Sequence, residues 1–249
     1  GLAALGGKVF VVGGGDDRGP RPVSVPAHAQ RDATLDIPTR ALRHVQIFDV
    51  ANSEWTAGPP LSARREGFLG HLALAAGGRV YSLTCPSDDE HFASGLLMES
   101  CSLDAQGECS AWRPEPSPPL QLDNPAGAAV GDVLYAVGAA GVCAFDTQDG
   151  SWSVLPPMPS SLTAPHVCEH EGALWVVSSP ASREEGGCAC YCYSPEEKTW
   201  SAGPEAPVNT GWGGAASMGG RVLLVSGAYR SDELGATVFD DRCWMSTGL

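Results

Sequence analysis

The sequence predicts an all-β fold that is assembled from five copies of one four-stranded unit. The first observation is a recurring phrase in which a strand ends in an aromatic residue and an acid, followed by a tryptophan and a Gly/Pro break. The second is a recurring apolar run that opens at a glycine. The third is composition, because 31 Gly and 20 Pro among 249 residues are typical of many short strands joined by tight turns. Internal repetition on this scale decides the architecture.

The recurring phrase predicts the third and fourth strands of each unit. It is clearest in residues 45–61, where Trp55 follows Phe48 by seven residues and a Gly-Pro-Pro break closes the unit. It returns, stretched in the second unit and compressed in the fifth, as Leu103-Asp104 with Trp112, Phe145-Asp146 with Trp152, Tyr193 with Trp200, and Phe239-Asp240 with Trp244. We expect the third strand to end at the aromatic position and the fourth strand to carry the tryptophan. The acids Asp49, Asp146 and Asp240 are expected to shape turns by bonding to their own backbone.

Two further strands precede the phrase in each unit. The second strands open at Gly7, Gly78, Gly131, Gly172 and Gly220. They are nearly continuous in apolar residues, as is typical of a strand that is covered on both faces. Before each of them lies a strand of small residues, in residues 2–5, 68–76, 126–130, 166–170 and 213–218. Small residues suit a crowded position near an axis, where backbones approach closely.

The spacing of the units predicts a β-propeller. Successive opening glycines are 71, 53, 41 and 48 residues apart, and four-stranded units of about 40–50 residues are propeller blades. Blades that pack side by side bury both faces of their sheets, which accounts for the apolar second strands. The predicted blades of this single domain are residues 1–61, 62–120, 121–160, 161–207 and 208–249. Residues 15–44 are predicted to form a long loop in the first blade.

The net charge and the cysteine content limit the kinds of partner and the cellular compartment that the sequence predicts. The formal net charge of −14 excludes non-specific nucleic-acid binding, which needs a basic face. No run approaches the ~20 apolar residues of a membrane helix, so no membrane partner is expected. Nine cysteines without a framework spacing, and no glycosylation sequon, favour a reducing, intracellular setting in the cytoplasm or the nucleus. Because the chain begins at Gly1 inside an apolar segment, we expect it to be a piece of a longer protein.

The fourth unit holds two alternating sets of metal-ligand residue types. They are His166, Cys168 and His170 on its first strand and Cys188, Cys190 and Cys192 on its third. Zinc accepts these atoms, but two strand spacings separate the sets by about 9.5 Å, whereas zinc bonds are only about 2.0–2.3 Å long. We therefore expect buried core residues, and no metal or other cofactor.

Motifs for enzyme chemistry are weak. Residues 215–219 resemble a nucleophile elbow but lack its first glycine and the helix that should follow. Residues 102–107 resemble a sialidase Asp-box whose tryptophan lies too far along the chain. No Gly-rich phosphate loop precedes a helix. We expect no catalytic residues and therefore no enzyme.

The repeated unit resembles the Kelch repeat. The match is strongest in the first unit, where V-F-V-V-G-G at residues 9–14 is followed by Phe48-Asp49 and Trp55. The other units carry Thr84-Cys85, Gly138-Ala139, Ser178-Ser179 and Ser226-Gly227 in place of the di-glycine. The resemblance covers essentially the whole chain and implies a Kelch β-propeller. Because Kelch propellers more often have six or more blades, the chain is either a five-bladed ring or part of a six-bladed one.

The loops of such a fold predict a binding face. Inter-blade loops and loops between second and third strands gather on one rim of a propeller, where exposed aromatic and arginine side chains anchor peptides. The candidate partner-binding residues are Arg64, Arg65, Asn124, His166, Asn209, Trp212, Tyr229 and Arg230. The arginines would pair with carboxylates, and Trp212 and Tyr229 would supply apolar anchors.

The resemblance also implies a function. Many intracellular Kelch propellers follow BTB and BACK domains and select substrates for a cullin-RING ubiquitin ligase. We therefore expect a protein-interaction module that binds a partner peptide or degron. The alternatives are cytoskeletal or scaffold binding and, less favoured, a Kelch-type enzyme such as a copper oxidase, a sialate epimerase or a hydrolase, which would need convergent acids or metal ligands at the channel mouth.

Overall fold

The structure, a computed structural model, describes residues 1–16, 40–41, 43–62, 71–84, 96–122, 125–160, 162–180, 189–206, 213–231 and 236–246. The chain divides into two compact parts, each of which contains several of the repeats. They are residues 1–73 with 78–115 and residues 74–77 with 116–249. Within the described ranges every regular element is a β-strand. No helix in this part of the chain has the length and hydropathy needed to cross a membrane.

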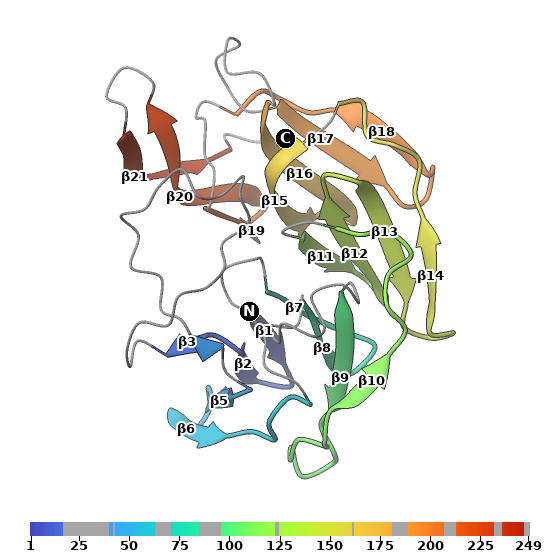
Figure 1. Cartoon of the computed structure of the whole chain (residues 1–249), viewed down its shortest axis with the longest axis vertical. Helices are drawn as coiled ribbons and strands as arrows, with labels where there is room; N and C mark the ends of the chain where they lie inside the picture. The colour runs from blue at the N-terminus through green and yellow to red at the C-terminus, as the bar shows by residue number, and fades with distance from the viewer. Residues whose placement is uncertain are drawn as a thin grey trace. The chain divides into compact units, whose positions relative to one another are not determined.

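The first half of the chain forms two four-stranded antiparallel sheets (Figure 1). The first sheet has the order β1 (Leu2–Leu5), β2 (Lys8–Val12), β5 (Val45–Asp49) and β6 (Glu54–Ala57). The second has the order β7 (Leu72–Ala76), β8 (Arg79–Thr84), β9 (Leu97–Ser102) and β10 (Arg113–Glu115). Within the predicted long loop, β3 (Gly15–Asp16) pairs with β4 (Arg40–Ala41), and residues 17–39 and 42 lie outside the described residues.

The second half forms three more sheets. The third has the order β11 (Ala126–Val130), β12 (Val133–Gly138), β13 (Gly141–Asp146) and β14 (Ser151–Val154). The fourth has the order β15 (Leu162–His170), β16 (Ala173–Pro180), β17 (Ala189–Ser194) and β18 (Thr199–Ala202). The fifth, as far as the structure describes it, has three strands, β19 (Gly214–Met218), β20 (Arg221–Ser231) and β21 (Ala236–Met245). The predicted all-β fold of repeated blades is confirmed.

The aromatic-to-tryptophan phrase is a cross-strand pair in three sheets. Phe48 lies opposite Trp55, Phe145 opposite Trp152, and Tyr193 opposite Trp200. The ring centroids are 5.0, 5.1 and 5.0 Å apart in these pairs. Tilted aromatic pairs at this distance stabilise a sheet beyond the apolar area that they bury. The prediction that these residues lie on the third and fourth strands is confirmed for these units.

Two units differ from the predicted alignment. In the second, Leu103 lies just past β9, and Cys101 instead stands opposite Val80, where the other units have the aromatic residue. In the fifth, Trp244 does not start a fourth strand, because β21 continues past Asp240 to Met245 and pairs Trp244 with Leu224. A register shift between Val225 and Gly227 of β20 accommodates the longer strand.

The acids after the aromatic positions shape turns, as predicted. Asp49 Oδ1 accepts hydrogen bonds from the backbone N–H groups of Ala51 and Asn52 at 3.0 and 3.1 Å. Asp146 Oδ1 accepts one from Gln148 at 2.8 Å. These short bonds close the turn between the third and fourth strands. The side chain of Asp240 lies outside the described residues.

The turns between first and second strands share a left-handed first residue. The five turns begin at Gly6, Gly77, Gly131, Glu171 and Gly219, with φ of 57°, 54°, 59°, 50° and 59°. Two-residue hairpin turns of this kind match the twist of the flanking strands. Four turns use glycine, which adopts this conformation without steric cost, and Glu171 is the exception.

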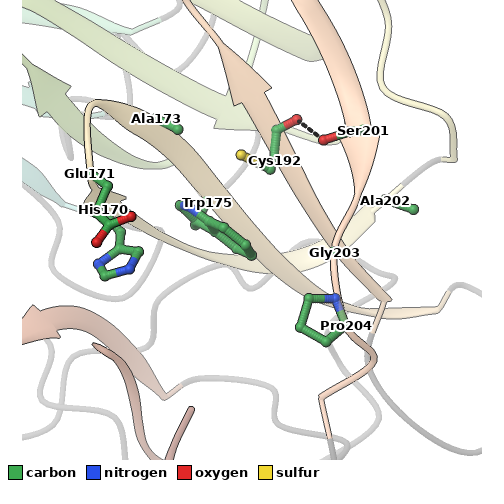
Figure 2. Close-up of a pocket in the computed structure, with 9 residues that line it drawn as sticks. All are labelled: His170, Glu171, Ala173, Trp175, Cys192, Ser201, Ala202, Gly203 and Pro204. Atoms are coloured by element: carbon green, nitrogen blue, oxygen red, sulfur yellow. Dashed lines mark hydrogen bonds between the residues drawn. The ribbon is translucent and has the colours of Figure 1, made fainter. Parts of the chain in front are cut away.

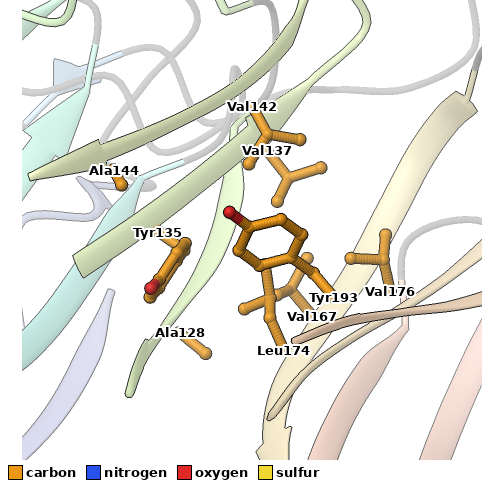
Figure 3. Packing of buried hydrophobic residues seen from close by; sticks show 9 residues of the cluster. All are labelled: Ala128, Tyr135, Val137, Val142, Ala144, Val167, Leu174, Val176 and Tyr193. Carbon is orange, nitrogen blue, oxygen red and sulfur yellow. The ribbon is translucent and has the colours of Figure 1, made fainter. Parts of the chain in front are cut away.

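The core is best described between the third and fourth sheets (Figure 3). Tyr135 and Val137 of β12 pack with Leu174 and Val176 of β16 and with Tyr193 of β17. The Tyr135 and Tyr193 ring centroids are 6.1 Å apart. On the other face of β16, Val177 is buried in a second cluster with Leu224, and the partly buried Trp175 packs against it. The second strand of this unit is therefore covered on both faces, as its sequence predicts.

Candidate functional site

Most of the predicted partner-binding residues lie outside the described residues. They are Arg64, Arg65, Asn124, Asn209 and Trp212. Tyr229 and Arg230 belong to β20, where their backbones pair with Val238 and Thr237. Both were expected beside a loop, and the structure places them near the end of a strand that continues to Ser231.

His166 requires a correction. The sequence predicts it both as a buried residue of the fourth unit's first strand and as a partner-binding candidate. The strand placement is confirmed, because it lies in β15 opposite Val177 and is only 6% exposed, and the partner-binding role is not supported. The strand runs from Leu162 to His170 and absorbs a register shift between Thr163 and His166. The chain therefore enters the sheet before His166, which makes this histidine part of the sheet interior.

The connections of the sheets differ sharply between their two ends. In the first and fourth sheets, first-to-second turns have two residues and third-to-fourth turns have four, whereas the third sheet also has a two-residue turn, Ala139-Ala140, between its second and third strands. Because the strands are antiparallel and sequential, the first-to-second and third-to-fourth turns share one end of each sheet, and all other connections leave from the opposite end. Counted from the bounds of the flanking strands, the longest of those connections are residues 13–44, 58–71, 85–96 and 203–213, and most of their residues lie outside the described ranges. The binding face expected at this end stays a prediction, because most of its candidate residues lie outside the described ranges.

The histidines and cysteines of the fourth sheet are arranged as the strand order predicts. Cys168 of β15 lies opposite Trp175 of β16, and Trp175 lies opposite Cys192 of β17, so β16 separates the two sets. Cys168 and Cys190 are buried in the cluster that contains Val177 and Leu224, and Cys188 lies outside the described residues. Burial raises the pKa of the Cys168 thiol to about 12, which keeps it protonated. Within the described ranges, no group of three or more His, Cys, Asp or Glu side chains is placed to hold a metal ion.

A hydrogen bond that the sequence did not reveal links successive units. The indole N–H groups of Trp112, Trp152 and Trp200 donate to the carbonyl oxygens of Pro59, Pro116 and Pro156 at 2.9, 2.8 and 3.0 Å. Each of these prolines follows the tryptophan of the preceding unit by four residues. The Gly/Pro break of one unit is thus the acceptor for the tryptophan of the next. The constant spacing was visible in the sequence, but its partner 36–53 residues away was not.

A cavity of about 450 Å³ lies on one face of the fourth sheet (Figure 2). Its lining includes His170 and Glu171 at the β15–β16 turn, Trp175 of β16, Cys192 of β17, Ser201 of β18 and Pro204. The volume is in the range of about 300–1,000 Å³ that is typical of binding pockets. An aromatic ring and a carboxylate in its lining suit an aromatic or a cationic side chain.

The walls of this cavity are fixed by specific contacts. His170 Nδ1 lies 2.9 Å from Ser217 Oγ, and the His170 and Trp175 rings meet edge to face at 6.1 Å. Gly203 lies so close to Trp175 that an added Cβ would approach Cζ3 of its ring to 3.0 Å. The N–H of Gly203 also donates to the Cys190 carbonyl at 2.8 Å. The segment that leads to Pro204 is therefore held against the sheet.

Comparisons with known proteins agree with this architecture. The chain is 24% identical over 245 residues to Kelch-like protein 23 of Mus musculus, an alignment that covers 92% of this chain and 36% of that protein. The chain thus spans about a third of this relative's length. The solved structure of YjhT superposes with a TM-score of 0.61 at 13% identity, over 99% of this chain and 82% of that one. A family model described as a protein of unknown function, DUF1668, matches residues 23–217, which is more than half of the chain. The chain is a Kelch-like β-propeller, and it belongs to the DUF1668 family of proteins of unknown function.

Proposed function

We propose that the chain is a protein-interaction module that binds an extended segment of a partner protein at the rim of the blades. The observation that carries this proposal is the unequal length of the connections at the two ends of the sheets. In the first and fourth sheets one end holds the tight turns of two and four residues, and the connections that leave from the other end are longer. A rigid platform with its variable segments at one end is the usual design of a binding surface.

The chemistry of the rim residues supports a peptide partner. Arg64 and Arg65 follow the fourth strand of the first blade, and Trp212 precedes the first strand of the fifth. Arginine pairs bidentately with carboxylates, and tryptophan is enriched among the residues that dominate binding energy. Asn124, Asn209, Tyr229 and Arg230 complete the candidate set. The partner segment would then carry both acidic and apolar side chains.

We propose further that the module selects substrates as part of a BTB-Kelch adaptor for a cullin-RING ubiquitin ligase in the cytoplasm. Support comes from the likeness to Kelch-like protein 23, which extends over 92% of the chain and only 36% of that protein. The Kelch resemblance associates such propellers with preceding BTB and BACK domains. In this arrangement the propeller binds the substrate and the other domains bind the ligase.

The test compares proteins captured by proximity labelling around the full-length parent. The variant Arg64→Ala/Arg65→Ala/Trp212→Ala should lose a defined group of partners while cullin-ligase components remain. The matched control, Glu54→Ala/Glu196→Ala, changes exposed acids at the tight-turn end of the blades and should lose none. Identical partner lists for the rim variant and the wild type would contradict the rim assignment. Recovery of cytoskeletal proteins without ligase components would favour scaffold binding over the adaptor role.

A further inference from the structure

We propose that Cys101 and Cys109 form a redox-active pair, which hydrogen peroxide converts reversibly into a disulfide. Cys101 lies in β9, and Cys109 lies in the connection from β9 to β10. Both belong to the same compact part of the chain, so the inference depends only on contacts within that part. It goes beyond the proposed binding function and is independent of the rim residues.

The second unit departs from the repeat at both cysteines. Cys101 stands opposite Val80, at the position where the first, third and fourth units have an aromatic residue. The connection that follows has ten residues, 103–112, whereas the same connection in those three sheets has four. Cys109 lies in this longer connection. The unit therefore has a thiol in place of a buried ring and an added segment that carries a second thiol.

The longer connection folds back onto the end of β9. Leu103 and Cys109 form an isolated β-bridge, and the N–H of Ser110 donates to the Ser102 carbonyl at 2.8 Å. Cys101 and Leu103 are two residues apart, so their side chains lie on the same face of the strand. Cys109, opposite Leu103, is therefore a diagonal neighbour of Cys101. The two side chains meet there, because the thiols share a hydrogen bond.

Further hydrogen bonds hold this connection in place. Asp104 Oδ1 accepts bonds from the N–H groups of Gln106 and Glu108 at 2.9 and 2.8 Å, which close the turn before the second cysteine. At the other end of the segment, the Trp112 indole donates to the Pro59 carbonyl at 2.9 Å. A segment that is anchored on both sides keeps one thiol beside the other. Such proximity favours a reaction between them over a reaction with a second molecule.

The two thiols differ in the way that a peroxide-reactive pair requires. Cys101 is fully buried, whereas Cys109 is partly exposed. Their hydrogen bond raises the pKa of Cys101, as does burial, and it lowers the pKa of Cys109 against the opposing effects of partial burial and the Glu108 charge. Redox-sensing cysteines have a low pKa, are accessible and lie beside a resolving cysteine. Cys109 is therefore the attacking thiol and Cys101 the resolving one.

The reaction proceeds in two steps. The Cys109 thiolate attacks one peroxide oxygen and the O–O bond breaks, which leaves a sulfenic acid on Cys109 and a hydroxide that takes up the thiol proton to form water. The Cys101 sulfur then attacks the Cys109 sulfur, the S–O bond breaks, and the leaving hydroxide takes the Cys101 proton to form a second water. Two thiols are thus oxidised while one peroxide is reduced. Exchange with two molecules of glutathione restores both thiols and yields glutathione disulfide.

The setting that the sequence predicts favours a reversible bond. In reducing compartments persistent disulfides are rare, and those that form are mostly transient and redox-sensing. This disulfide would fix the connection to the end of β9. The same connection carries Trp112, whose indole joins the second unit to Pro59 of the first. Oxidation would therefore stiffen the junction of these two units.

The experiment treats the complete chain, reduced and then freed of reductant, with hydrogen peroxide near neutral pH and blocks the remaining thiols with N-ethylmaleimide. A protease that cleaves after glutamate separates the two cysteines at Glu108, so in mass spectrometry only a disulfide keeps them in one species. We expect the linked species to form about tenfold faster than any oxidation of Cys243, which is exposed. Added glutathione should restore both thiols.

Variants of the chain assign the two roles. Cys101→Ser removes the resolving sulfur but keeps a hydroxyl donor, so Cys109 should stop at the sulfenic acid, which dimedone traps. Cys109→Ser should abolish the disulfide and leave Cys101 unmodified. The matched control Cys243→Ser should leave the rate of disulfide formation unchanged. Arg64→Ala/Arg65→Ala should also leave it unchanged, so failure of the rim proposal and failure of this one can be told apart.

Three outcomes in the unmodified sequence would overturn the inference, whether or not the variants fold. Oxidation of Cys243 without a Cys101–Cys109 species would show that the pair has no special reactivity. Accumulation of dimedone-trapped Cys109 in place of the disulfide would remove Cys101 as the resolving thiol. A disulfide-linked dimer in a denaturing, non-reducing gel, with no linked species in the monomer, would show that the bond joins two copies of the chain instead.

Discussion

The hydrogen bond between Trp200 and the Pro156 carbonyl should make a measurable contribution to stability. Trp200→Phe keeps a ring against Tyr193, whose centroid lies 5.0 Å away, but removes the indole N–H that donates to Pro156 O at 3.0 Å. An intramolecular hydrogen bond of this kind contributes about 0.5–1.5 kcal/mol. The smaller ring of a half-buried residue costs about 0.5 kcal/mol more in apolar contact. We expect a loss of about 1–2 kcal/mol in the free energy of unfolding.

The matched control is Trp55→Phe in the first unit. Trp55 makes the same ring contact with Phe48, at 5.0 Å, but it is 58% exposed. Among the described residues, the structure records no bond from its indole to a proline carbonyl. Its replacement should cost about 0.5 kcal/mol or less. Chemical denaturation of both variants measures the difference, and equal losses in the two would refute the structural role of the indole-to-proline bond.

Three further predictions concern single residues. Glu171→Gly should raise the free energy of unfolding by about 1 kcal/mol, because glycine adopts the turn's left-handed φ of 50° without steric cost, and a lower melting temperature would show that the carboxylate stabilises the fold. The thiol hydrogen bond between Cys101 and Cys109 raises the pKa of Cys101 and lowers that of Cys109. Peptide mapping after brief alkylation near neutral pH should therefore find Cys109 modified first. Equal labelling rates for the two cysteines would contradict this prediction. Hydrogen bonds from Lys8 and from backbone N–H groups lower the pKa of Asp49. The ionised carboxylate of Asp49 therefore stabilises the fold at pH values above the unfolded pKa of about 3.9. This contribution is lost as the pH falls through the folded pKa. Asp49→Asn should therefore destabilise the chain at pH 7 and lose this effect as the pH falls through the folded pKa of Asp49, which urea denaturation over a series of acidic pH values would check.

The strand pattern could be predicted from the sequence where local chemistry fixes it. Glycines that open the second strands occupy turns whose φ favours them, and Asp49 and Asp146 cap the turns that follow the third strands. The aromatic-to-tryptophan spacing marks a four-residue turn, so pairs such as Phe145 and Trp152 face each other. These signals act over fewer than ten residues, which is why reading along the chain detects them.

Prediction from the sequence failed where the pairing register between two strands decides how far a strand extends. Phe239-Asp240 looks like the end of a third strand, but β21 continues because its hydrogen bonds to β20 shift register between Val225 and Gly227. His166 is correctly predicted to lie in a strand, yet its choice as a partner-binding residue overlooks its burial, which follows a register shift between Thr163 and His166. An aromatic residue followed by an acid indicates a local preference for a turn. The length of a strand depends instead on its pairing with another strand many residues away.

The cavity could not be predicted because it depends on a difference between units. Repeat proteins gain stability from each unit and from its interface with the next, so the space beside one sheet depends on which residues the following unit supplies. Here the acceptor surface of the fourth unit, with Trp175 and Pro204, follows the repeat, whereas Ser246 of the fifth stands where an aromatic residue would.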